Sequence, residues 1–167
     1  MDTIGPPADP MFDTERKRFS TSGHYWSHPT IIDKKVFDTF QSFCKTMYES
    51  SGIILANGKG LKGSKPTFSN DLVCFNGAGP ADGDTFYFPR VSDDLFGVVP
   101  PQSLNLYERL CNTHRFPYDT MVVACLEAAV YFDIIPSWRS DGYKEDHLDG
   151  LILFVSIKNF HTKEEIN

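Results

Sequence analysis

The stretch Pro117–Phe132, PYDTMVVACLEAAVYF, decides the fold of this chain. A proline suits the start of a helix, where its missing N–H leaves no bond unmade, and Asp119 brings a carboxylate to the positive end of the helix dipole. From Met121 onward nearly every position is apolar. A helix without a broad polar stripe is buried on most sides, so we predict that a helix over about Tyr118–Phe132 is the spine of the core.

Two further helices are predicted, one on each side of this spine in the sequence. Asp33 can accept hydrogen bonds from the backbone two and three residues on, and apolar residues then recur at helical spacing. Leu148–Ile157 fits either period, and its ILFVSI run is rich in strand-forming residues. We nevertheless predict helices over about Asp33–Ser50 and Lys144–Phe160.

Short strands are expected between the helices. Thr67–Asn76 and Asp84–Arg90 are apolar or alternating runs joined by the turn-rich loop NGAGPADGD, which predicts a hairpin. Ile134–Trp138 is a third predicted strand, whereas Leu104–Cys111 is predicted to form a short helix. The fold class is therefore α+β, with one small antiparallel sheet packed by helices.

The chain has the length of one domain. With 167 residues, of which 41% are hydrophobic, it can bury a substantial core, and we place a single domain over residues 23–167. Residues 1–22 carry Pro6, Pro7 and Pro10 among few apolar residues, so we expect a flexible N-terminal arm. The segment GHYWSHPT that follows is expected to be an ordered loop or a short extended piece.

Charge and hydropathy indicate which classes of partner, and which cellular location, to expect for this chain. The net charge of −6, from 22 acidic and 16 basic residues, disfavours binding to a phosphate backbone, so nucleic acid is not expected. No apolar run is long enough to span a bilayer, and the N-terminus lacks the pattern of a secretory signal. We therefore expect an intracellular, by default cytoplasmic, protein without a membrane partner.

Three short motifs favour structural roles. The loop NGKGLKGSK resembles a phosphate-binding loop, but Ser64 precedes Lys65 and a proline follows where a helix should open. His24 and His28 have the spacing of metal ligands on a helix, but Gly23 and Pro29 disfavour a helix there. The four cysteines form no C-x-x-C pair, which indicates buried free thiols, or disulfides if the protein is secreted.

The segment SDGYKEDHLDG is the best candidate for a metal site. Carboxylates and imidazole bind divalent cations, and the candidate ligands are Asp141, Asp146, His147 and Asp149. The alternative is that these residues only cap and solvate the start of a helix. The sequence requires no cofactor, so we expect none. The alternative is that a divalent metal binds at this segment.

A second candidate site lies at the entry of the apolar helix. Backbone N–H groups at a helix start and a nearby cation can hold an anionic group. We therefore name Arg115, Tyr118, Asp119 and Asp141 as candidate ligand-binding residues. The alternative is that Asp119 only caps the helix and that Arg115 only pairs with a surface acid.

Four segments carry a resemblance to a known family. CFNGAG, FYFPR, CNTHRFPYDTMVVACLEAA and RSDG resemble the corresponding segments of a family of small proteins without a known activity. The likeness spans about Phe75–Gly150; Asn112 stands where the family has lysine, and Arg139 where it has serine. The resemblance implies that the F-N-G turn, the P-Y-D helix entry and the S-D-G turn belong to one module and lie close together in space.

The sequence supports two functional hypotheses. No nucleophile lies in a recognisable catalytic motif, so an enzyme is not required, and we expect a non-catalytic interaction or assembly protein that binds a protein partner or itself. The alternative is a small metal-assisted hydrolase or small-ligand-binding domain that uses the acidic and histidine cluster over Asp141–Asp149.

Overall fold

The computed structural model describes residues 23–92 and 106–166, so the predicted arm over residues 1–22 lies outside the described residues. The elements, in chain order, are β1 (Gly23–Pro29), α2 (Lys34–Ser51), β2 (Thr67–Phe68), β3 (Leu72–Phe75), η1 (Gly79–Ala81), β4 (Phe86–Pro89), β5 (Leu106–Asn112), α3 (Asp119–Tyr131), β6 (Trp138–Ser140), η2 (Lys144–His147) and α4 (Leu148–Ile166). The fold is α+β, as predicted.

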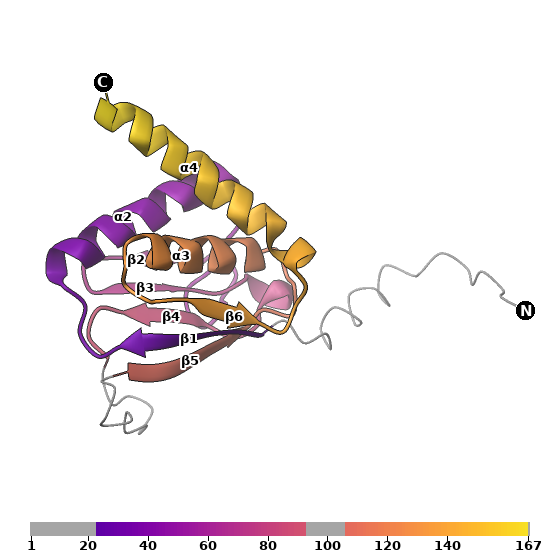
Figure 1. Cartoon of the computed structure of the whole chain (residues 1–167). Coiled ribbons are helices and arrows are strands. Elements are labelled where there is room, and N and C mark those ends of the chain that lie inside the picture. Colours follow the sequence, from indigo (N-terminus) through magenta and orange to yellow (C-terminus); the bar gives the residue numbers. More distant parts are fainter. Residues whose placement is uncertain (1–22, 93–105, 167) are drawn as a thin grey trace, which may run out of the picture.

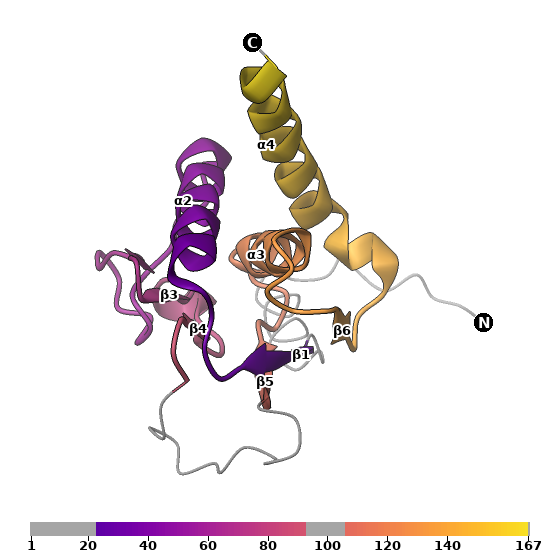
Figure 2. The ribbon, with the colours of Figure 1, turned by 60° about the vertical axis from the view of Figure 1, so that its left-hand side comes forward.

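The helices lie on one side of the strands (Figure 1). Figure 2 views α3 nearly end-on, with α2 and α4 rising on either side of it and the strands below. Both outer helices contact α3. The apolar helix thus occupies the centre of the molecule.

The helix α3 is the predicted spine of the core. Its buried residues are Asp119, Met121, Val122, Val123, Ala124, Cys125, Leu126, Ala128 and Ala129. Glu127 lies at the edge, where its Oε1 accepts a hydrogen bond of 2.8 Å from Trp138 Nε1. No described helix is long and apolar enough to cross a membrane.

The predicted start of α2 is confirmed. Asp33 Oδ1 accepts hydrogen bonds from the backbone N–H groups of Lys35 and Val36, at 3.0 and 3.1 Å. These contacts satisfy two donors that have no partner within the helix. The helix ends at Gly52, whose φ of 72° is a left-handed conformation that glycine adopts without steric cost.

The strands form two sheets of three, where the sequence predicted one. The predicted hairpin is confirmed as β3 and β4, which pair Cys74 with Tyr87. The predicted single strand Thr67–Asn76 was wrong, because the chain turns after Phe68, where the N–H of Ser69 donates to the carbonyl of Leu72, and β2 pairs back on β3 as a third strand. The second sheet has the order β5-β1-β6 and is antiparallel throughout. Its central strand, β1, is the segment that was predicted as a loop or a short extended piece.

The predicted strand Ile134–Trp138 was wrong in position. The chain turns sharply after α3, at Asp133 with φ 58°, and the N–H of Ile134 donates back to the carbonyl of Ala129. Ile134 and Ile135 are thereby buried beside the helix end, and the strand β6 begins only at Trp138. Burial against the helix prevails over the strand propensity of two isoleucines.

The predicted helix Leu104–Cys111 was also wrong. Its described part is β5, which pairs with β1 along its whole length, from Leu106 opposite Pro29 to Asn112 opposite Gly23. Leu110 is exposed and Cys111 is buried, as neighbours on a strand alternate. Pairing with β1, which is far away in the sequence, therefore determines that this segment is a strand.

The C-terminal segment is helical, as predicted. The short helix η2 leads directly into α4, which packs against α3. The contact is close because Gly150 has no side chain: a Cβ at this position would lie 2.6 Å from Val123 Cβ and 2.9 Å from the carbonyl oxygen of Thr120. Gly150 therefore fixes how near the start of α4 lies to the start of α3.

Candidate functional site

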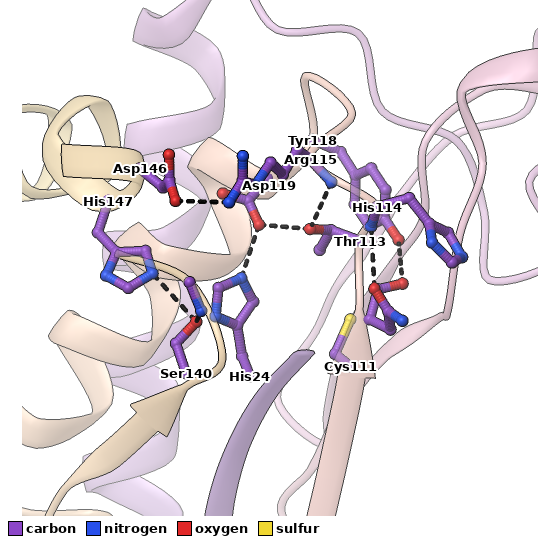
Figure 3. A network of polar contacts seen from close by, with 12 residues as sticks. His24, Cys111, Thr113, His114, Arg115, Tyr118, Asp119, Ser140, Asp146 and His147 are labelled. Carbon is purple, nitrogen blue, oxygen red and sulfur yellow. Dashed lines mark hydrogen bonds and ion pairs between the residues drawn. The ribbon is translucent and has the colours of Figure 1, made fainter. Parts of the chain in front are cut away.

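A buried polar network joins β1 to the first turn of α3 (Figure 3). His24 Nε2 lies 2.6 Å from Asp119 Oδ1, and Thr113 Oγ1 donates to the same oxygen. His24 and Thr113 are fully buried, and Asp119 is 8% exposed. Because a carboxylate oxygen only accepts, we assign the proton of His24 to Nε2. The network therefore holds one carboxylate oxygen between two buried donors.

The turn before α3 has an unusual backbone. His114 and Arg115 both have left-handed conformations, with φ of 52° and 61°. Such conformations cost roughly 1 kcal/mol or more each for residues other than glycine, and they persist only where surrounding contacts enforce them. Here the N–H of His114 donates to Asn112 Oδ1, and the N–H of Arg115 donates to Thr113 Oγ1. The turn leads into α3, where Asp119 lies within hydrogen-bond distance of His24.

A second histidine lies beside the first. The rings of His24 and His147 have centroids 5.6 Å apart, and Trp138 packs edge-on against both, at 5.7 and 5.2 Å. His147 Nε2 lies 3.1 Å from Ser140 Oγ. Burial, and then the neighbouring His24, lower the pKa of His147 below its ordinary value. His147 is therefore a neutral imidazole at neutral pH.

One nitrogen of His24 is left over. Its Nδ1 is buried, and no described residue forms a hydrogen bond with it. A buried polar atom without a partner costs free energy, on the order of 1–3 kcal/mol. Such atoms are uncommon in folded proteins, and each is explained by stored strain, by a role in a site, or by a bound water or ion.

A surface cavity opens beside Asp119. Its volume is about 370 Å³, and it is lined by Arg115, Phe116, Pro117, Asp119, Thr120, Asp146 and Asp149. Arg115 Nη2 donates to Asp146 Oδ2 at 2.8 Å, so the guanidinium already has a carboxylate partner. Three carboxylates against one guanidinium make the lining negative.

The four predicted ligand-binding residues divide among three places. Arg115 and Asp119 line the cavity. Tyr118 is 1% exposed, and its hydroxyl donates to the carbonyl of Asp84 at 2.8 Å. Asp141 accepts a hydrogen bond of 2.8 Å from the hydroxyl of Tyr25, away from the cavity. Arg115 does pair with an acid, as the alternative stated, whereas Asp119 binds His24 rather than capping α3.

The four predicted metal ligands have separate roles. Asp146 pairs with Arg115, His147 contacts Ser140 and Asp149 lines the cavity, while Asp141 binds Tyr25. Within residues 23–92 and 106–166, no group of three or more His, Cys, Asp or Glu side chains is arranged to hold a metal ion. The arrangement of the described residues does not itself build the predicted metal site.

The F-N-G turn packs against the helix entry at Tyr118. Asn76 Oδ1 accepts from the N–H groups of Gly77 and Gly83, and its Nδ2 donates to the carbonyl of Gly83. A Cβ on Gly83 would clash with the hydroxyl oxygen of Tyr118. The turn therefore packs on the P-Y-D entry but does not line the cavity.

The other motifs have structural roles. Asn57 Oδ1 accepts from the N–H groups of Lys59 and Leu61, so the glycine- and lysine-rich loop is an ordered turn of its own. All four cysteines are free; Cys44, Cys111 and Cys125 are buried, and Cys74 is partly buried. Burial raises the pKa of these thiols at Cys44 and Cys111, which suppresses their reactivity.

Sequence reasoning missed part of the network. Thr113 and Ser140 carried no signal, because a single hydroxyl has no pattern of its own. His24 was treated as a structural residue or a metal ligand on a helix, whereas it is on a strand and binds Asp119. The network joins segments 95 residues apart in the chain.

Comparisons of this chain with protein-family models, with curated proteins and with solved structures give no match.

Proposed function

We propose that this domain binds a small organic cation, such as a primary ammonium compound, in the cavity at the start of α3. The observation that carries the proposal is the carboxylate of Asp119, which lines the cavity while two buried donors hold one of its oxygens. A carboxylate fixed in advance loses little freedom when it binds a ligand, and this preorganisation favours affinity.

The charge of the lining supports a cationic ligand. The only guanidinium of the lining, that of Arg115, is already paired with Asp146. Asp149 is exposed at the edge of the cavity and has no hydrogen bond or ion pair with another described residue. Asp119 and Asp149 therefore offer two carboxylates to one ligand. An anion would instead meet repulsion from both.

The size and walls of the cavity suit a small molecule. A volume of about 370 Å³ falls in the range of small-ligand sites, which is roughly 300–1,000 Å³. Phe116 and Pro117 supply the apolar part of the wall. A ligand with a short hydrocarbon portion and one ammonium group matches this combination.

The test is a titration followed by two-dimensional ¹H–¹⁵N NMR. The probes are a series of small primary amines and the carboxylic acids with the same carbon skeletons. We expect the amines, but not the acids, to shift the backbone resonances of Thr120 and Asp149. Equal shifts with both series, or shifts with neither, would contradict the proposal.

Two variants locate the binding. Asp149→Asn should weaken amine binding at least threefold, and Asp119→Asn at least tenfold, because each removes one carboxylate from the cavity. The matched control is Asp133→Asn, at the opposite end of α3, where φ is 58° and asparagine tolerates that backbone. Binding by the control should equal that of the unchanged chain.

Metal binding remains a separate proposal for the residues Asp141, Asp146, His147 and Asp149. Elemental analysis of the purified protein, with thermal melts in the presence and absence of a chelator, tests it. A stoichiometric divalent metal whose removal lowers the melting temperature would support a metal-assisted activity; no metal and an unchanged melt would remove it.

An interaction or assembly role is a second candidate function. The observation that favours it is an apolar face of α4 that no described residue covers, with Leu148 at 55% and Ile152 at 57% exposure. This face is separate from the cavity, so the two functions are compatible and can be tested independently.

A further inference from the structure

The helix α4 is apolar on two opposite faces. One face packs against α3 through Gly150 and Phe154, which are buried. On the other face, Leu148, Ile152 and Val155 are 55%, 57% and 45% exposed. A helix that is apolar on all sides is normally enclosed by other elements. The described chain encloses only half of α4.

The exposed residues have the spacing of a coiled-coil seam. Leu148, Ile152, Val155 and Asn159 follow one another at intervals of four, three and four residues, and all four are exposed. We name these four residues the α4 stripe. This alternation places them at successive d, a, d and a positions of a heptad, on one line along the helix. The stripe is therefore a continuous seam rather than scattered surface residues.

We propose that the α4 stripe binds the same stripe of a second copy of this chain, as a parallel two-stranded helix pair. In this arrangement each residue of the stripe meets its own counterpart. Leu148 at d and Ile152 at a match the combination that favours two strands in parallel coiled coils, whereas Val155 is a β-branched residue at d. The proposal rests on the assembly role proposed above for this face of α4 and does not depend on the cavity beside Asp119.

Asn159 argues for a second copy rather than an unrelated partner. An asparagine side chain both donates and accepts hydrogen bonds, so two of them facing each other satisfy one another. A single asparagine at an a position fixes register and favours the dimer, at some cost in stability. An apolar groove on another protein that covered Asn159 would leave this amide without a partner.

The position of α4 in the molecule permits the pairing. Figures 1 and 2 show its C-terminal half extending beyond α3 and away from the strands. The stripe lies opposite the face that packs on α3, so the two protomers would lie on the outer sides of the helix pair. Lys158, which is next to Asn159 in the sequence, has its Nζ over the ring of Tyr131, 5.4 Å from the ring centroid, and so lies towards α3 rather than on the stripe.

The stripe is short, which sets the expected affinity. Four residues on about three turns bury less than the roughly 1,200 Å² of a typical stable interface. We therefore expect a reversible dimer with a dissociation constant in the micromolar range, rather than a permanent one.

Sedimentation of the full chain over a range of concentrations tests the proposal. We expect the mass to rise from monomer to dimer in the micromolar range, and Ile152→Glu to weaken dimerisation at least tenfold. The matched control is Ile54→Glu, because Ile54 is 78% exposed and lies outside α4. A chain that stays monomeric at several hundred micromolar, or a dimer that both substitutions weaken equally, would overturn the proposal.

A cross-link tests the parallel register. In a parallel pair Val155 faces Val155 of the other copy, so Val155→Cys should form an intermolecular disulfide under mild oxidation. Ser156→Cys, one position off the stripe, is the matched control and should cross-link far less. Equal yields from the two variants would overturn the parallel arrangement, even if a dimer forms. Asn159→Leu should tighten association and admit species larger than a dimer.

Discussion

The two histidines of β1 differ in what surrounds them, although both are fully buried. His28 Nε2 donates to the carbonyl of Pro89 at 2.8 Å, and its Nδ1 accepts from Trp26 Nε1 at 3.1 Å. His24 binds a carboxylate through Nε2, its Nδ1 has no described partner, and a second imidazole lies beside it. Both ring nitrogens of His28 thus have hydrogen-bond partners, whereas only one ring nitrogen of His24 has a described partner.

This difference shows that burial alone does not reveal a role. His28 has a neutral partner on each nitrogen and an aromatic contact with Phe88, which is what a structural histidine requires. His24 connects the sheet to a charged group at the edge of a cavity. The partners of a buried histidine, rather than its exposure, separate the scaffold from the candidate site.

The largest expected effect is the loss of stability when His28 is removed. His28→Ala leaves a cavity beside Phe88 and abandons two hydrogen-bonding partners, so it should lower the free energy of unfolding by about 3–5 kcal/mol. Urea unfolding at pH 7 measures this. Ser27→Ala, a half-buried neighbour on the same strand, is the control and should cost under about 1 kcal/mol. Similar losses for both variants would contradict a structural role for His28.

The second effect is on the pH dependence of stability. Burial lowers the pKa of His28 from an ordinary 6.5 to about 3, and Arg109 contributes in the same direction, against the hydrogen bond to Pro89. The unfolded chain therefore binds a proton below pH 6.5 that the folded chain does not bind until about pH 3. As the pH falls from 6.5 to about 3, the free energy of unfolding should therefore decrease by up to roughly 1.4 kcal/mol per pH unit.

The pH effect is isolated by a variant that cannot titrate. Denaturant unfolding of the unchanged chain and of His28→Gln, measured at several values between pH 7 and pH 4, gives the part of the slope that His28 contributes. Carboxylates contribute equally to both chains. If the two slopes are the same, His28 is not the group that loses stability in acid.

A smaller effect is expected at the other histidine. Asp119→Asn keeps the shape of the side chain but removes the charge that accepts from His24 and Thr113, so it should cost about 1–3 kcal/mol. Chemical unfolding at pH 7 measures it, with Asp133→Asn as the control. A loss as large as that of His28→Ala would mean that the His24 network is as structural as His28, and the contrast between the two would be gone.

The smallest effect is a shift in the titration of His147. Its pKa should lie below the ordinary 6.5, because burial disfavours the charged form of the imidazole and the neighbouring His24 acts in the same direction. Imidazole NMR resonances followed against pH report this directly. In His24→Asn the pKa of His147 should rise, while the spectrum of the rest of the chain confirms folding. An unchanged value would show that the two imidazoles do not interact.

Local patterns predicted the helices but not the sheet that carries the site. The apolar run of α3, the cap at Asp33 and the C-terminal helix were all readable from neighbouring residues. The strand β5 was predicted as a helix, because only its pairing with β1 reveals its state. Propensity decides little when the partner strand lies far away in the sequence.

The candidate site was predicted in part for the same reason. Arg115 and Asp119 stood out because they flank the start of an obvious helix. Their buried partners did not, because His24 and Thr113 reach Asp119 only after β1 has paired and the left-handed turn at His114 and Arg115 has formed. The side chains of His114 and Arg115 do not predict that both residues adopt a left-handed backbone conformation.

The central place of β1 has a consequence for the order in which the molecule forms. Both neighbours of β1 come late in the chain, since His24 pairs with Cys111 on one side and with Ser140 on the other. Contacts between distant segments require costly loop closure and so form slowly. During synthesis, which proceeds from the N-terminus, β1 has to wait without partners until most of the chain has left the ribosome. The hairpin of β3 and β4 can form long before that, whereas the sheet that carries His24 can be completed only after β6 has been made.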